Sequence, residues 1–190
     1  MNIPHPLIKI ACLKINPGSC FLDFGCGLGK DSIFMAKKGF KVTAVDKNQK
    51  KIEKLKQTIF DKKLGNKIEV INQDIGDFII EKDKYSLISL YNVLQFLPKR
   101  HSFKIIEQVK NRLLKHGIVV ISAFTDNDPL FEKENKENKT FFTHQELKKL
   151  FEDFKIIFYK EKRITEKGHI GYPEPHIHNV VRIIAQKIKS

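Results

Sequence analysis

Short apolar runs alternate with amphipathic segments along the first two thirds of the chain. Runs of strand length occur at five places, at about residues 20–24, 41–45, 68–72, 85–91 and 118–124. Between these runs, apolar positions recur with a helical period near residues 29–38, 48–63 and 99–114. Because strands that alternate with helices pair in parallel, with the helices covering the sheet, this pattern predicts a doubly wound α/β fold.

The C-terminal third of the chain departs from this alternation. Residues 126–139 form a charged tract without an apolar period, which indicates a long surface loop. This loop would leave the carboxyl edge of the sheet, where ligands bind in open α/β folds, so a substrate lid and a plain connection are equally compatible with it. A short helix is expected to begin at Thr143, and two apolar runs at 154–160 and 176–185 predict an antiparallel strand pair that ends the sheet.

The first predicted strand ends in an acid followed by three alternate glycines, in the order Asp23-Phe24-Gly25-Cys26-Gly27-Leu28-Gly29. A glycine has no Cβ, so such a loop can turn sharply and lets a ligand approach bare main chain. The position at the end of a buried parallel strand predicts a site for a nucleotide-type cofactor.

Three cofactor classes use loops of this kind, and the neighbouring residues separate them. A P-loop is excluded, because Phe24 and Asp31 occupy the positions of its first glycine and its Ser or Thr. A dinucleotide fingerprint is weakened but stays open, because Lys30 stands where the third glycine belongs. Asp23 would repel a pyrophosphate but attract an ammonium or sulfonium group. S-adenosylmethionine carries both of these cations and no phosphate.

The stretch 22–32, followed by 39–48, resembles the class I S-adenosylmethionine-dependent methyltransferases, and within them the TehB-like branch linked to tellurite resistance. The resemblance covers residues 4–124 well and the later chain more loosely. It implies a Rossmann-like, doubly wound seven-stranded sheet, mostly parallel with an antiparallel last strand. Residues 1–190 would then form a single methyltransferase domain, with 126–139 as its candidate lid.

Two carboxylates are expected to hold the cofactor. Asp46 closes the second predicted strand and can accept both ribose hydroxyls, although an Asp there could instead cap the next helix. By resemblance Asp74 contacts the adenine amino group and Ile75 donates its backbone N–H, with a helix cap again the alternative for Asp74. Cys26 would contribute backbone only. The full set of expected cofactor-binding residues is Asp23, Gly25, Cys26, Gly27, Gly29, Asp31, Asp46, Lys47, Asp74, Ile75 and Leu90.

The end of the fourth predicted strand, residues 88–96, lies where the family places the transferred methyl group. It lacks the Asn/Asp-Pro-Pro-aromatic signature of enzymes that methylate nucleobase or amide nitrogens, which favours a small-molecule acceptor. Tyr91 and Gln95 are expected on the acceptor side, with ordinary packing as an equal alternative. The resemblance implies in-line displacement that leaves S-adenosylhomocysteine, in which alignment of the reactants can supply about 7–11 kcal/mol.

Three histidines lie within ten residues, at His169, His176 and His178, and the last two share one face of a strand. No Cys or acidic ligand at metal-site spacing accompanies them, although Glu174 is nearby, so no metal is expected. Together with Arg163 they predict an electropositive wall for an anionic acceptor, or else an exposed pair on the last strand.

The formal net charge of +13 raises the question of nucleic-acid binding. The lysines are scattered over the predicted helices, and the chain has only four arginines, the residue preferred for phosphate and base contacts, which argues against nucleic acid. Three cysteines without C-x-x-C spacing support neither a disulfide framework nor a zinc site. No run approaches the roughly 20 apolar residues of a membrane span, and lysines interrupt the N-terminal apolar stretch, so a cytoplasmic protein is expected.

The sequence therefore predicts methyl transfer from S-adenosylmethionine to a small molecule, with an oxyanion such as tellurite as one candidate. An RNA or protein methyltransferase, a non-catalytic S-adenosylmethionine-binding module and an NAD-binding protein remain as alternatives. The sequence carries no signal for an oligomeric state.

Overall fold

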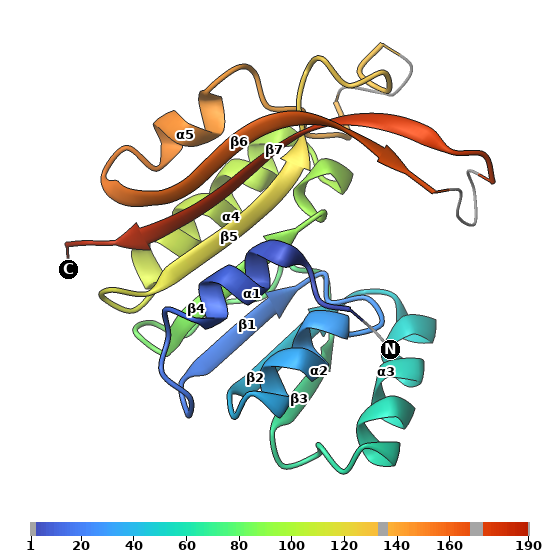
Figure 1. Cartoon of the computed structure of the whole chain (residues 1–190), viewed down its shortest axis with the longest axis vertical. Helices are drawn as coiled ribbons and strands as arrows, with labels where there is room; N and C mark the ends of the chain where they lie inside the picture. The colour runs from blue at the N-terminus through green and yellow to red at the C-terminus, as the bar shows by residue number, and fades with distance from the viewer. Residues whose placement is uncertain (1–2, 133–136, 168–172, 190) are drawn as a thin grey trace.

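A seven-stranded sheet forms the centre of the molecule (Figure 1). The structure is a computed structural model and describes residues 3–132, 137–167 and 173–189. Among these residues the strand order is β3-β2-β1-β4-β5-β7-β6. The strands are β1 (Cys20–Phe24), β2 (Lys41–Asp46), β3 (Ile68–Asn72), β4 (Tyr85–Tyr91), β5 (Ile118–Phe124), β6 (Phe154–Glu166) and β7 (His176–Lys187). Strands β1 to β5 pair in parallel and β7 runs antiparallel to both of its neighbours, which confirms the predicted fold class.

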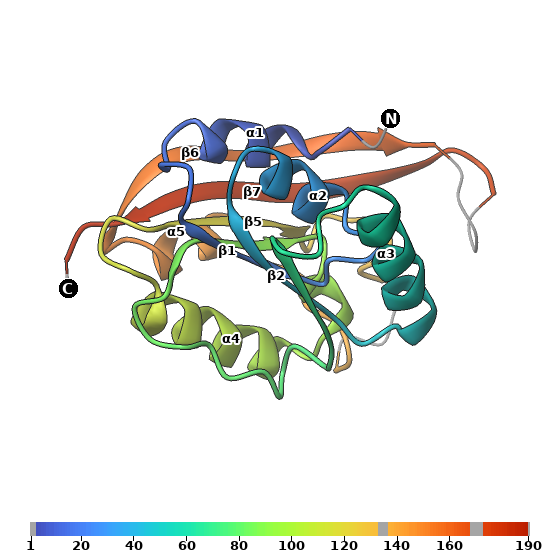
Figure 2. The same ribbon diagram turned by 90° about the horizontal axis from the view of Figure 1, so that it is seen from below.

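Helices cover both faces of the sheet (Figure 2). The first three helices pack on one face, and the last two pack on the other. Chain order reverses between β1 and β4, and in open α/β sheets ligands bind at the carboxyl ends of the strands beside such a reversal. The described helices are α1 (Pro6–Cys12), α2 (Lys30–Lys37), α3 (Gln49–Asp61), α4 (Lys99–Arg112) and α5 (Glu146–Leu150), with a 3-10 turn η1 (Leu94–Phe96).

The apolar runs are continuous because the central strands are buried on both faces. Phe21 and Leu22 are adjacent on β1 and fully buried, yet Phe21 joins the cluster under α1 to α3 and Leu22 the cluster under α4. Successive side chains of a strand point to opposite faces, so each residue of such a run packs against a different layer. None of the described helices is long and apolar enough to cross a membrane.

The helices have the amphipathic pattern that the sequence predicts. In α3, Ile52, Leu55 and Ile59 are buried along one stripe, and the Asn48 side chain caps the first turn by accepting from the Lys51 N–H at 3.1 Å. The short helix α5 is displaced from its predicted start, because its N-cap is Gln145 rather than Thr143. Helix α1 was not predicted, and it packs its buried Leu7, Ile8 and Ala11 against the sheet.

The β6–β7 pair is longer than the strands beside it (Figure 1). β5 ends at Phe124, which pairs with Val180, so the first residues of β7 lie beyond the carboxyl end of β5. There they pair only with the end of β6, where Glu166 lies opposite His176. The hairpin therefore carries side chains from the edge of the sheet over the ligand-binding side.

Candidate cofactor and acceptor site

The glycine loop is shaped by close packing at its ends and is open in its middle. At Gly25, with φ 64°, a methyl group in place of the hydrogen would lie 2.5 Å from Val93 Cγ2, so only glycine fits between the two segments. At Gly29 the same methyl group would overlap Leu55 of α3. At Gly27 it would meet no atom within 4 Å, so the main chain there is free to contact a ligand.

Asp46 joins this loop to the end of β2. Its Oδ2 accepts a hydrogen bond from the Gly27 N–H and its Oδ1 accepts one from the Asn48 N–H, both at 2.8 Å. The alternative that Asp46 caps α3 is wrong, because Asn48 is the N-cap. Each carboxylate oxygen has a further lone pair, so Asp46 can still accept ligand hydroxyls.

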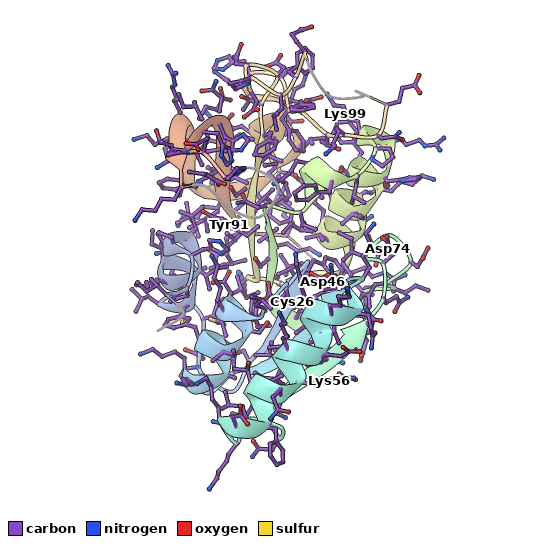
Figure 3. All side chains as sticks on the ribbon, turned by 90° about the vertical axis from the view of Figure 1, so that its right-hand side faces the viewer. Cys26, Asp46, Lys56, Asp74, Tyr91 and Lys99 are labelled. Atoms are coloured by element: carbon purple, nitrogen blue, oxygen red, sulfur yellow. The ribbon has the colours of Figure 1, made fainter. Side chains whose placement is uncertain are left out.

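A hollow of about 470 Å³ lies at the carboxyl ends of β1, β2 and β4, and several expected cofactor-binding residues line it. In Figure 3 Asp46 and Cys26 lie between Tyr91 on one side and Asp74 on the other. A second hollow of about 510 Å³ adjoins it and shares Lys47, Asp74, Phe96 and Leu97 with it. The first hollow is lined by Gly25, Asp46, Lys47, Asn48, Lys51, Asp74, Ile75, Asn92, Val93, Phe96 and Leu97.

Asp74 forms one wall of this hollow as an ionised group. Its Oδ1 accepts from the Gly76 N–H at 2.9 Å and its Oδ2 accepts from Lys47 Nζ at 3.1 Å. The hydrogen bond from Gly76, helped by Lys47, lowers the pKa of this carboxyl. The alternative that Asp74 caps a helix is wrong, because a turn and then β4 follow it. Leu90 is fully buried in the core, and its contact with the cofactor through the backbone stays a prediction.

Asp23 lies beneath the glycine loop and is only 4% exposed. The Ser32 hydroxyl donates to its Oδ2 at 2.6 Å. Burial, reinforced by the nearby charge of Asp31, raises the pKa of Asp23 to about 8. Without a cation beside it, this carboxyl therefore holds a proton at neutral pH, and a bound cation would favour its release.

Cys26 behaves as a buried packing residue within the loop. Burial, with Asp23 and Asp46 nearby, raises the pKa of its thiol far above the ordinary value. The thiolate is the reactive form of cysteine, so this side chain is inert at neutral pH. This agrees with the expectation that Cys26 offers its backbone rather than its sulfur.

The acceptor end is assembled around Tyr91. The His5 ring stacks on the Tyr91 ring with centroids 3.7 Å apart, and Arg182 Cζ lies 5.6 Å from the Tyr91 centroid. His5 is held by Asp31, which accepts from its backbone N–H at 2.8 Å and contacts its Nδ1 at 2.5 Å. Burial raises the pKa of Tyr91, so its phenol stays neutral.

Two polar atoms near this end are buried without a hydrogen-bond partner among the described residues. They are Gln95 Oε1 and Arg182 Nε. Buried polar groups are nearly always paired, so unpaired ones are typical of positions that a ligand completes. The sequence predicts Gln95 but does not single out Arg182. Strand alternation could have identified it, because Arg182 lies four residues after His178 on the same strand and therefore on the same face.

Arg163 does not belong to the acceptor wall, and this part of the prediction is wrong. It pairs with Asn179, whereas Ile164 pairs with His178, so alternation turns Arg163 to the opposite face of the hairpin from His176 and His178. Arg163 is exposed there. Arg182 is the arginine that shares the face of the two histidines.

His176 and His178 lie together with an acid that the sequence did not suggest. Their rings meet edge to face with centroids 4.9 Å apart. The nearby acid is Glu166, which β6 places opposite His176, and not Glu174, whose backbone oxygen contacts His176 Nδ1 at 3.0 Å. Pairing across strands brings them together despite their separation in sequence. His169 lies outside the described residues.

The predicted loop at 126–139 is anchored where it leaves β5. Asp128 is 3% exposed and accepts from the backbone N–H groups of Asn179 at 2.7 Å and Leu130 at 2.9 Å. Its Oδ2 also contacts His178 Nδ1 at 3.0 Å. The first part of the loop is therefore fixed to β7. Residues 133–136 lie outside the described residues, so the lid stays a prediction.

Comparison with curated proteins finds relatives that are longer than this chain. One is the carboxy-S-adenosyl-L-methionine synthase of Psychromonas ingrahamii, 32% identical over 76% of this chain and 57% of that protein. The enzyme of the same name from Yersinia enterocolitica is 31% identical over 67% of this chain and 50% of that protein. The chain thus spans about half the length of these relatives.

Solved structures with the same fold include TehB from Haemophilus influenzae. It is 26% identical with a TM-score of 0.83, over 97% of this chain and 62% of that chain. A S-adenosylmethionine-dependent methyltransferase from Methanosarcina mazei shares the fold, at 20% identity and a TM-score of 0.73 over 98% and 99% of the two chains. A Burkholderia thailandensis methyltransferase solved with S-adenosylhomocysteine also shares it, at 15% identity and 0.70 over 97% and 78%.

A sequence profile described as tellurite resistance protein TehB matches residues 3–169. This match spans the glycine loop, the Asp46 hollow and all of β6. It agrees with the resemblance that the motif around Asp23 and Gly27 showed. The chain therefore belongs to the TehB family of class I S-adenosylmethionine-dependent methyltransferases.

Proposed function

We propose that this chain binds S-adenosylmethionine in the hollow beside the glycine loop and transfers its methyl group to a small anionic acceptor. The cofactor is the one that the relatives' names contain. In this proposal Asp46 holds the ribose hydroxyls, Asp74 and Ile75 hold the adenine, and Asp23 attracts the cationic methionine end. Gly25, Cys26 and Gly27 would contact the cofactor through their backbone.

The observation that carries the proposal is the hydrogen bond between the Gly27 N–H and Asp46 Oδ2. It holds the glycine loop beside a carboxylate that lines the hollow and keeps lone pairs for ligand hydroxyls. A bound cation would favour the ionised form of the buried acid Asp23 behind this loop and a pyrophosphate would not, which supports S-adenosylmethionine over NAD.

The acceptor class follows from charge at the other end. Arg182 carries a cationic guanidinium, and its buried Nε has no partner among the described residues. An anion beside Tyr91 would supply that partner. The family description points to an oxyanion of the tellurite kind, which presents oxygens to a guanidinium and a lone pair to the methyl carbon.

The reaction in this proposal is a single displacement. A lone pair of the acceptor forms a bond to the methyl carbon while the bond from that carbon to sulfur breaks, and sulfur keeps the electron pair as a neutral thioether. The leaving group needs no proton, so the chain's task is to align the acceptor with the methyl group and exclude competing water. Stacked His5 and Tyr91 provide a rigid wall for this alignment.

One lysine-rich hollow, of a kind that would suit a nucleic-acid substrate, lies away from the candidate site. A hollow of about 500 Å³ that is rich in lysine, with Lys82, Lys110 and Lys187 among its residues, lies at the amino edge of the parallel strands. The glycine loop lies at the carboxyl edge. A nucleic acid bound to these lysines would not reach a methyl group beside Tyr91, which supports the small-molecule acceptor over RNA.

Calorimetric titration tests the cofactor first. Wild-type protein and Asp46→Ala are titrated with S-adenosylhomocysteine and, separately, with NADH, with Asp61→Ala as the control because Asp61 is an exposed acid at the far end of α3. We expect S-adenosylhomocysteine to bind wild type and Asp61→Ala equally and to bind Asp46→Ala at least about 100-fold more weakly, since two hydrogen bonds to a charged group are lost. Binding of NADH alone would overturn the proposal.

Methyl transfer from isotopically labelled S-adenosylmethionine then tests the acceptor. Tellurite and selenite are offered alongside a neutral thiol and a transfer RNA. Label transferred to an oxyanion supports the proposal. Cofactor binding with label on RNA, or with no transfer at all, would leave the cofactor site standing and contradict the acceptor.

A further inference from the structure

The end of the β6–β7 hairpin brings three potential metal ligands together. Glu166, His176 and His178 each offer one ligand atom, and these atoms all lie within 4.8 Å of one another. His176 Nε2 lies 3.9 Å from Glu166 Oε2. The register produces the cluster, because Glu166 pairs with His176 and His178 lies two residues further along the same face.

Both rings are oriented through the nitrogen that faces away from the cluster. His176 Nδ1 lies 3.0 Å from the backbone oxygen of Glu174, and a carbonyl can only accept, so this nitrogen carries the proton. In the neutral ring Nε2 then carries a lone pair and no proton. His178 Nδ1 lies 3.0 Å from Asp128 Oδ2, which is the carboxylate-histidine arrangement found behind metal-bound imidazoles.

Asp128 is itself held firmly in this supporting position. Its side chain is fully buried, and the backbone N–H groups of Asn179 and Leu130 donate to its two oxygens. A carboxylate fixed in this way has no freedom to turn away from the ring. The second layer of contacts that orients a metal ligand is therefore already in place for His178.

We propose that Glu166, His176 and His178 bind a divalent transition-metal ion of the zinc class. Two imidazoles and one carboxylate are a ligand set that zinc takes in open sites, with the fourth position left to water or substrate. Bonds of about 2.0–2.2 Å in a tetrahedral site place ligand atoms about 3.3–3.5 Å apart. The cluster needs to contract by little more than 1 Å, and the partly exposed, flexible Glu166 can supply most of that movement.

The ion would lie on the acceptor side of the molecule. Glu166 is near enough to Tyr91 for its charge to contribute to the raised pKa of that phenol, and Arg182 lies on the same strand and face as the two histidines. The open coordination position would thus be available to an acceptor with a lone pair. The metal site itself rests only on the hairpin, so it stands or falls separately from methyl transfer.

Direct metal binding tests this inference. Protein without an affinity tag is stripped with chelator and titrated calorimetrically with Zn²⁺ alone, and Co²⁺ is added separately to record the absorption of a four-coordinate site. The variants are Glu166→Gln, His176→Ala and Asp128→Asn. The matched control is His144→Ala, because His144 Nδ1 lies 2.8 Å from Glu161 on the exposed surface and has the same kind of acid partner.

We expect one equivalent of Zn²⁺ to bind to wild type and to His144→Ala with equal affinity. Glu166→Gln and His176→Ala each remove a ligand and should weaken binding by at least about 100-fold, and Asp128→Asn should weaken it by about 10–100-fold. Thermal melts without metal identify any variant that fails to fold. Because Glu166 is near the surface, Glu166→Gln should fold normally and so still tests the metal site. Wild-type protein that binds no Zn²⁺, or Glu166→Gln that binds it as tightly as wild type, would overturn the proposal.

Discussion

The two ends of the candidate site are built in different ways. The cofactor end uses residues that follow β1, β2 and β3 directly, and its hydrogen bonds link Gly27 to Asp46 and Lys47 to Asp74, neighbours in successive strand-loop units. The acceptor end combines distant parts of the chain: Tyr91 of β4 contacts both His5, from the segment before α1, and Arg182 of β7. One end is local and repetitive, and the other depends on long-range assembly.

This difference separates two kinds of function. The strand-loop units fix the backbone around the cofactor, so that end changes only if the sheet itself changes. Around Tyr91, the acceptor end is set by single side chains from the segment before α1 and from the β6–β7 pair, which can be exchanged without disturbing the parallel strands. The fold therefore suits one cofactor and many acceptors, and substitutions at the two ends should have separable effects.

The largest expected effect comes from Gly25→Ala, which tests whether the cofactor end depends on the backbone. The new methyl group would lie 2.5 Å from Val93 Cγ2 at a left-handed φ of 64°. Strain and overlap together should lower the free energy of unfolding by about 3 kcal/mol or more. Urea unfolding measures the loss.

Gly27→Ala is the matched control, because its φ is also positive while its methyl group would meet nothing within 4 Å. It should cost only about 1–2 kcal/mol of strain and should still weaken S-adenosylhomocysteine binding. Equal destabilisation by the two alanines would contradict the packing argument.

The sequence predicted the strand ends and the glycine loop of the cofactor end well, for the reason that this contrast suggests. Strand limits, the glycine loop and Asp46 are all encoded within short stretches, where apolar runs and glycines have few alternative structures. The helix-cap alternative for Asp46 was settled only by the structure, because Asn48 two residues later is an equally good cap. A sequence alone does not show which of two neighbouring polar residues takes the cap.

The acceptor end could not be predicted in the same way. His5 has no motif around it, and its contact with Tyr91 depends on where α1 packs. Arg163 is close in sequence to the histidines, but strand alternation turns it to the opposite face. The register between β6 and β7 places Glu166 beside them instead. Register across a long hairpin is a tertiary property, and no local pattern encodes it.

Asp23 allows the cofactor end to be probed through pH. Its pKa is raised to about 8 in the folded protein, above the unfolded value of about 3.9. Between these two values the unfolded chain releases this proton while the folded protein keeps it, so the contribution of Asp23 to stability falls as pH rises from about 4 to about 8. Asp23→Asn should therefore be more stable than wild type at pH 8 and nearly equal to it at pH 4.

Urea unfolding at the two pH values, with and without S-adenosylmethionine, measures this effect. A bound cation favours the ionised carboxyl, so cofactor should stabilise wild type more at pH 8 than at pH 6, and this gain should be smaller in Asp23→Asn. If the free energy of unfolding of Asp23→Asn equals that of wild type at both pH values, Asp23 is ionised in the folded protein.

Arg182→Gln tests whether the two ends are separable. Loss of the fixed positive charge should lower kcat/KM for an anionic acceptor by about tenfold or more, since a charge-assisted hydrogen bond is removed. The Kd for S-adenosylhomocysteine should stay the same, because Arg182 does not line the hollow beside Asp46. Arg163→Gln is the control, as an exposed arginine on the other face of the same hairpin. Equal losses in the two variants would mean that only overall charge matters.

The smallest expected effect is that of Asn48→Ala, which tests whether the helix cap at the cofactor end affects only the stability of α3. The Asn48 side chain accepts from the Lys51 N–H and caps α3, while its backbone N–H donates to Asp46. Alanine removes the cap and keeps the backbone bond, so the free energy of unfolding should fall by about 1 kcal/mol with acceptor kinetics unchanged. Gln49→Ala, which removes only an exposed bond to Glu53, should cost about half as much or less. A change in the KM of the acceptor in Asn48→Ala would show that α3 is coupled to the distant end, because Leu55 of this helix packs against Gly29 of the glycine loop.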